Sequence, residues 1–125
     1  MLVGLGVDLV EIDRVERSLL RWGERLVEKL MDPEEAAVLP GAAPERALAL
    51  ACAIAAKEAA SKAIGTGWSR GVRWRDVQLL PGPPASVRLL RRAASVARAL
   101  GSDGRSRIAL ETRGNLVVAE LRLLG

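Results

Sequence analysis

An alanine-rich segment, residues 44–64, constrains the fold of this chain more than any other feature of the sequence. It begins at Pro44 and Glu45, contains no internal glycine or proline, and ends before Gly65, a residue typical of a helix C-cap. Alanine combines the highest helix propensity with a small side chain, so such a helix can pack closely on all sides. The sequence therefore predicts a long central helix.

Three charged residues interrupt this apolar segment in the stretch "AAKEAASKAIGTGW", residues 55–68. Glu58 and Lys62 are four residues apart, with the acid first, and this spacing by itself is typical of a surface ion pair. The following Gly65-Thr66-Gly67 predicts a loop that other backbones or ligands can approach closely. Spacing alone leaves open whether the two charges are functional.

The first ten residues predict a strand, because "LVGLGVDLV" at 2–10 is apolar with two glycines that allow close backbone approach. The segment lacks the third glycine of a dinucleotide-binding fingerprint, so we disfavour that function. Asp8 interrupts the apolar run near the end of the strand. It is either a turn or helix-capping residue or a functional carboxylate.

Apolar residues at helical spacing predict one helix from about Ile12 to Met31. A second, cationic stripe follows the same helix and aligns five side chains along one ridge. These are Arg14, Arg17, Arg21, Arg25 and Lys29. A solvated helix face and a docking ridge for an acidic partner are the two interpretations of this stripe.

The remaining segments alternate between short helices and strands. "DPEE" at 32–35 predicts a helical turn with Pro33 at its first position, and "PGPP" at 81–84 a rigid turn. We expect strands at 72–80, 86–89, 105–112 and 115–124, a helix at 91–100, and a hairpin turn at Arg113-Gly114. The order predicts a single α+β domain, residues 1–125, with the long helix packed on a small antiparallel sheet.

Composition narrows the chemistry that the chain can perform. It has no histidine and one cysteine, Cys52, which excludes His-dependent nucleophilic pairs, thiolate metal clusters and an intramolecular disulfide. Carboxylates, Lys, Arg or oxygen-liganded Mg²⁺ remain. The net charge of +4 favours an anionic partner. We expect a cytoplasmic protein without a signal peptide or membrane span, and no nucleic-acid binding.

Two blocks of sequence resemble the holo-acyl-carrier-protein synthase family, the small phosphopantetheinyl transferases. They are "MLVGLGVDLVEIDRVE" at 1–16 and "AAKEAASKAIGTG" at 55–67, with the "DPEE" segment between them as in the family. The resemblance implies a phosphopantetheinyl-transferase-like fold. It also implies transfer of 4′-phosphopantetheine from coenzyme A to a serine of an apo acyl carrier protein, with Mg²⁺ at the pyrophosphate and release of 3′,5′-ADP.

The resemblance assigns roles to particular residues of this sequence. Asp8 and Glu58 match the metal-binding positions, and Glu58 also matches the acceptor of the serine proton, directly or through water. Lys62 would contact the phosphates and stabilise the leaving group, beside a phosphate-binding loop of Gly65, Thr66 and Gly67. Arg14, Arg17, Arg21 and Arg25 would dock the acidic carrier protein. The family also implies a homotrimer with active sites between subunits.

This sequence departs from the family pattern at three places around coenzyme A. The usual Arg-Phe is Ala53-Ile54, the Gly-Lys-Pro turn is Gly82-Pro83-Pro84, and the Ser-x-Ser-His motif aligns with residues 108–111, so that Glu111 takes the histidine position. Arg70, Arg88 or Arg107 are candidate replacements for the lost cations. The alternative function is a catalytically impaired relative that binds carrier proteins or assembles with an active homologue.

Overall fold

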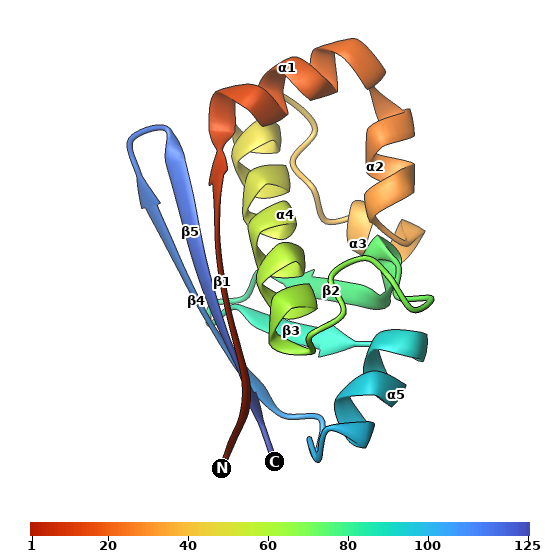
Figure 1. Cartoon of the computed structure of the whole chain (residues 1–125). Coiled ribbons are helices and arrows are strands. Elements are labelled where there is room, and N and C mark those ends of the chain that lie inside the picture. The colour runs from red at the N-terminus through yellow and green to blue at the C-terminus, as the bar shows by residue number, and fades with distance from the viewer.

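The computed structural model describes residues 1–125, arranged as an α+β fold around one long helix (Figure 1). The elements, in chain order, are β1 (Leu2–Glu11), α1 (Ile12–Trp22), α2 (Glu24–Leu30), α3 (Pro33–Ala36), α4 (Glu45–Ala63), the 3₁₀ turn η1 (Trp74–Asp76), β2 (Val77–Leu80), β3 (Ser86–Leu89), α5 (Arg91–Ala99), β4 (Ser106–Arg113) and β5 (Leu116–Leu124). The expected fold class is confirmed.

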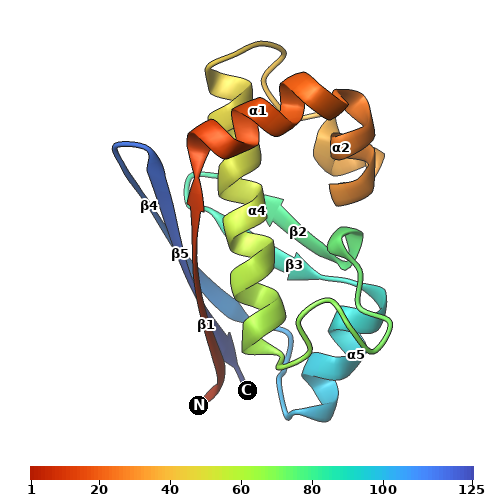
Figure 2. The same ribbon diagram turned by 45° about the horizontal axis from the view of Figure 1, so that its top comes forward.

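The main sheet contains three antiparallel strands in the order β1-β5-β4, and β2 pairs with β3 in a separate hairpin. Alternate residues of β5 are buried, from Val117 to Leu123, and this face of the sheet packs against α4. Figures 1 and 2 show α4 between the sheet and the rest of the molecule.

Helix α4 contributes more residues to the core than any other element, in keeping with its composition. Its buried residues include Leu50 and eight alanines, from Ala47 to Ala63. All of them except Ala47 belong to a hydrophobic cluster that also contains Val27 and Leu30 of α2 and Val77 of β2. Because alanine removes bulk on every side, α4 can be approached by the sheet, by α1 and by β2 at once.

Strand β1 lies unusually close to α4, and two glycines make this possible. A Cβ atom at Gly4 would overlap the carbonyl oxygen of Ala63, and one at Gly6 would overlap that of Ala59. The close approach that the N-terminal sequence predicts is therefore present. It brings the backbone of β1 against the last two turns of the helix.

One helix over residues 12–31 is a wrong prediction, since the segment forms two helices. Gly23 ends α1 with φ of 57° and ψ of −138°, and α2 starts at the next residue in a new direction. The positive φ is readily adopted by glycine, which explains the break. Apolar spacing continues across Gly23 because both helices bury one face, including Val15 and Val27.

Two smaller boundaries also differ from expectation. Residues 74–76 form the turn η1, so the strand expected from residue 72 begins only at Val77. The hairpin turn between β4 and β5 consists of Gly114 and Asn115, one residue later than expected. No helix of the structure combines the length and the apolarity that are needed to cross a bilayer.

Candidate functional site

Asp8 and Lys62 meet where β1 packs against α4. Side chains of a strand alternate, so Asp8 points to the same face of β1 as Gly6, toward the helix. Lys62, in the last turn of α4, reaches back so that its Nζ lies 2.6 Å from Asp8 Oδ1 and 3.3 Å from the carbonyl oxygen of Val7. Two residues 54 positions apart therefore form one charged cluster.

Glu58 lies one helical turn before Lys62 and contributes to the same electrostatic environment. The hydrogen bond to Asp8 is the main cause that raises the pKa of Lys62, and the charges of Asp8 and Glu58 add to it while desolvation opposes it. Glu58 itself is half-buried. The structure thus joins Asp8 and Lys62 directly and places Glu58 near enough for its charge to act on Lys62.

The cluster offers two carboxylates to a cation. No three His, Cys, Asp or Glu side chains of the chain come together as a candidate metal site. Mg²⁺ commonly binds through one or two protein carboxylates and takes its remaining ligands from phosphates and water. Asp8 and Glu58 have the donor chemistry for that arrangement.

The loop of Gly65, Thr66 and Gly67 follows directly after the cluster. Gly65 and Gly67 have φ of 80° and 55°, and no atom of the chain blocks the space beside either Cα. Their N–H groups, however, donate to the carbonyl oxygens of Lys62 and Ser61. Only the N–H of Thr66 donates to no group of the chain, so the loop offers open space and one amide rather than three.

The cations of the predicted ridge are divided between two helices. Arg14 pairs with Glu11 at 3.6 Å and Arg17 with Asp13 at 3.3 Å, whereas Arg21 lies over the Trp22 ring at 5.0 Å. Arg25 and Lys29 belong to α2, beyond the break at Gly23, and line a surface hollow with Trp22 and Leu26. A single continuous ridge of five cations is therefore a wrong prediction.

A buried ion pair beside the site was not predicted from the sequence. Lys57 and Glu35 are both buried, with Nζ 2.8 Å from Oε1, and Lys57 also donates to the carbonyl oxygens of Trp74 and Val77. Glu35 Oε2 accepts the N–H of Leu79 at 2.9 Å. Burial lowers the pKa of Lys57, and Glu35 opposes this effect. The sequence feature that could have predicted this pair is the position of Lys57 within the most apolar part of α4, where a lysine needs a buried counter-ion.

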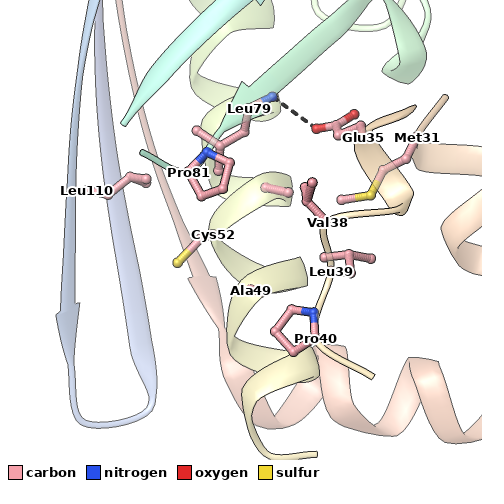
Figure 3. A pocket seen from close by; sticks show the side chains of 11 residues that line it. Met31, Glu35, Val38, Leu39, Pro40, Ala49, Cys52, Leu79, Pro81 and Leu110 are labelled. Carbon is pink, nitrogen blue, oxygen red and sulfur yellow. Dashed lines mark hydrogen bonds between the residues drawn. The ribbon is translucent and has the colours of Figure 1, made fainter. Parts of the chain in front are cut away.

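Glu35 also borders an apolar pocket, which Figure 3 shows. The pocket has a volume of about 290 Å³ and its walls are mostly apolar. They are formed by α4, β2, β4 and the segment after α3, with side chains such as Leu39, Leu79 and Leu110. Cys52 lines it, and burial raises the pKa of this thiol. Asp8, Glu58 and Lys62 are not among its lining residues.

The candidate replacement cations differ in availability. Arg88 is 3.7 Å from Glu34, whereas Arg70 and Arg107 form no ion pair in the chain. Glu111, at the position aligned with the family histidine, is exposed and paired with Arg113 at 2.7 Å. Arg113 thus offsets the negative charge of Glu111, which is unusual at the position of the family histidine.

Comparison with known proteins identifies the class of this fold and site. The model of the 4′-phosphopantetheinyl transferase superfamily (ACPS) matches residues 4–113. This range contains β1 from Gly4 onward, α4 and the loop after it, and therefore Asp8, Glu58 and Lys62. The chain belongs to this superfamily.

Its relatives within the superfamily are holo-acyl-carrier-protein synthases. The chain is 41% identical over 122 residues to that of Acidithiobacillus ferrooxidans, covering 95% of this chain and 94% of the relative. It is 46% identical over 107 residues to that of Alkalilimnicola ehrlichii, covering 83% of each. The crystal structure of the Neisseria meningitidis synthase superposes with a TM-score of 0.84 at 26% identity, over the full length of both chains.

Proposed function

We propose that this chain is a holo-acyl-carrier-protein synthase that transfers 4′-phosphopantetheine from coenzyme A to a serine of an apo acyl carrier protein. The observation that carries the proposal is the contact of Asp8 with Lys62, because it joins the two sequence blocks that define the family resemblance. The names of the relatives support the same activity. A related chain, 26% identical and with a TM-score of 0.70, is described as a complex with coenzyme A.

The reaction forms one P–O bond and breaks another. The serine oxygen of the carrier protein attacks the phosphorus that bears the pantetheine arm, and the pyrophosphate bond opens to release 3′,5′-ADP. The serine proton goes to Glu58, directly or through water, since no histidine is present to accept it. Lys62 offsets the negative charge that develops on the departing phosphate.

Asp8 and Glu58 are the residues that would hold Mg²⁺. Their hard oxygen donors fit this cation, and their number fits a site that the pyrophosphate of the substrate completes. The metal, when bound, would neutralise phosphate charge in this site. The chain's own contribution is to orient the two carboxylates and Lys62 through the close packing of β1 on α4.

The loop Gly65–Gly67 provides room for the nucleotide phosphates. Two glycines leave the backbone uncovered, and the N–H of the buried Thr66 has no acceptor in the chain. Arg70 follows in the same connection, carries no ion pair, and has a positive φ of 56°. The family usually has an arginine at the position of Ala53, and Arg70 is our first candidate to replace that cation.

The carrier protein docks on α1 and α2. Four arginines, Arg14, Arg17, Arg21 and Arg25, are exposed there, and an acidic partner complements them. Arg21 and Arg25 are without a carboxylate partner, whereas Arg14 and Arg17 already neutralise an acid of α1 or its start. Arg21 and Arg25 are therefore expected to contribute more to docking than Arg14 and Arg17.

We further propose a homotrimer that assembles through the outer face of β1. Leu5, Val7 and Leu9 alternate with the residues that face α4, and are 52%, 49% and 56% exposed. A contiguous apolar stripe of this kind on a sheet is typical of an interface. A neighbouring subunit would bring its own side chains to the cluster at Asp8, as the family resemblance implies.

The cellular setting follows from the partners. Coenzyme A and apo carrier protein are the two substrates, and the carrier belongs to fatty-acid or polyketide synthesis. We place the reaction in the cytoplasm, where the unpaired thiol of Cys52 would stay reduced. The structure offers no observation that favours the non-catalytic alternative.

Release of 3′,5′-ADP tests the proposal. The wild-type protein should release 3′,5′-ADP from coenzyme A when apo carrier protein and Mg²⁺ are present, and chromatography measures the product. The Asp8→Asn variant should release little. Holo carrier protein, whose serine is already modified, is the matched negative control. Absence of release by the wild-type protein with several apo carrier proteins would reject the function.

A further inference from the structure

The ammonium group of Lys62 lies on the carboxylate that a divalent cation would use. Its Nζ is 2.6 Å from Asp8 Oδ1, a short charge-assisted contact, and 3.3 Å from the Val7 carbonyl oxygen. Both acceptors belong to β1, so the lysine bridges the C-terminal turn of α4 to the strand. The contact between Lys62 and β1 therefore consists of these two hydrogen bonds within one chain.

A cation that binds Asp8 must compete with Lys62. Asp8 and Glu58 are the carboxylates that would hold it, and no group of three His, Cys, Asp or Glu side chains forms a metal site in the chain. If Lys62 kept its place, a divalent cation and an ammonium group would share one carboxylate, and their like charges would repel. Strong cation binding therefore requires that Lys62 moves away.

Lys62 has open space around its side chain, whereas Asp8 is largely covered. The side chain of Lys62 is 52% exposed and that of Asp8 only 18%. A lysine has a flexible four-carbon stem, and the two acceptors on β1 are the only groups that hold its Nζ. Phosphates bound at Gly65–Gly67, within one turn of Lys62, would offer it a stronger anionic partner.

From these contacts we propose that Lys62 is a gate for the metal site. It keeps Asp8 closed to divalent cations until the phosphates of the nucleotide draw its ammonium group away, so that cation and nucleotide bind cooperatively. The inference rests on the proposed function, because the nucleotide is the 3′,5′-ADP portion of coenzyme A. By linkage, the cation must also strengthen nucleotide binding by the same factor.

Binding of Mn²⁺ to the free protein tests the gate, with unbound Mn²⁺ measured by electron paramagnetic resonance. In the wild-type protein, 3′,5′-ADP should tighten Mn²⁺ binding by about tenfold or more. Lys62→Met should bind Mn²⁺ at least about tenfold more tightly than wild type without nucleotide, and should gain less from it. Lys62→Arg keeps the charge and should resemble wild type.

Two results would overturn the gate. One is a Lys62→Met protein, helical by circular dichroism, that binds Mn²⁺ no more tightly than wild type. The other is a Lys62→Arg protein that behaves like Lys62→Met, since the charge would then be irrelevant. The assay contains no carrier protein, so failure of the gate differs from failure of the proposed function, which appears as missing 3′,5′-ADP release by the wild-type protein.

Discussion

Single residues decide the chemistry of this site, and Glu58 is the most informative of them. Glu58→Gln keeps the shape of the side chain but removes both the charge and the ability to accept a proton. We expect kcat for transfer to fall by about 10²–10⁴-fold. Initial rates of holo carrier formation give the measurement. Glu45→Gln, in the exposed first turn of the same helix, is the control and should leave the rate unchanged.

Gly6 tests how closely β1 packs on α4. Gly6→Ala places a Cβ against the Ala59 carbonyl oxygen, and overpacking of this kind lowers the free energy of unfolding by about 1–3 kcal/mol. Urea denaturation measures the loss. Gly41→Ala adds the same methyl group where no atom lies within 4 Å. Equal stability of the two variants would contradict the packing argument.

The sequence pointed to Asp8, Glu58 and Lys62 through the resemblance of two blocks to the family, because apolar context and spacing alone left a cap residue and a surface ion pair as alternatives. It did not identify the partnership of Lys57 with Glu35, since these residues are 22 positions apart and belong to segments whose relative placement depends on the whole fold. The loop Gly65–Gly67 shows the same limit. The sequence shows its glycines, but it does not show that two of its N–H groups donate hydrogen bonds to carbonyl oxygens of α4.

At the scale of elements, the Lys57–Glu35 pair joins α4, α3, η1 and β2. Glu35→Ala should lower the free energy of unfolding by about 3–5 kcal/mol, because it leaves a buried ammonium group without its counter-ion. Glu34→Ala, next in sequence but 74% exposed in its side chain, should cost less than about 1 kcal/mol. Denaturant unfolding measures both variants.

The double variant Glu35→Leu with Lys57→Met separates the charge from the packing. Replacing both members of a buried ion pair with apolar residues of similar size is often neutral, so we expect it to be more stable than Glu35→Ala. A double variant as unstable as the single one would show that the hydrogen bonds to Trp74, Val77 and Leu79, not the unpaired charge, are responsible.

Helices α1 and α2 form the surface proposed to bind the carrier protein. Arg21→Glu combined with Arg25→Glu should raise the KM for the carrier protein by about tenfold, since charge reversal slows association. The KM for coenzyme A should stay nearly constant. Arg98→Glu, on α5, is the matched charge control. An equal rise in both Michaelis constants would indicate damage to the fold instead of to docking.

The break between these helices illustrates what an element-level pattern omits. Apolar residues continue at helical spacing on both sides of Gly23, so the spacing was consistent with a single helix over residues 12–31. The positive φ of Gly23 belongs to a corner that lets α2 turn and pack Val27 and Leu30 into the core. Long, glycine-free α4, in contrast, was predicted within one residue at both ends.

At the scale of the whole molecule, the stripe of Leu5, Val7 and Leu9 predicts association. Leu5→Glu combined with Leu9→Glu should convert a trimer into monomers, because it places charges in an apolar interface. Light scattering at micromolar concentration measures the mass. Leu100→Glu is the control, since Leu100 is 49% exposed but is the C-cap of α5 and not part of the β1 stripe. A wild-type protein that is monomeric would reject the trimer.

The intact mass of an apo carrier protein incubated with this protein, coenzyme A and Mg²⁺ tests the central claim most directly. The account predicts that the carrier gains the mass of one 4′-phosphopantetheine group, and that a carrier whose acceptor serine is replaced by alanine gains nothing. A carrier that binds this protein but keeps its original mass would contradict the claim that Asp8, Glu58 and Lys62 form a working transferase site.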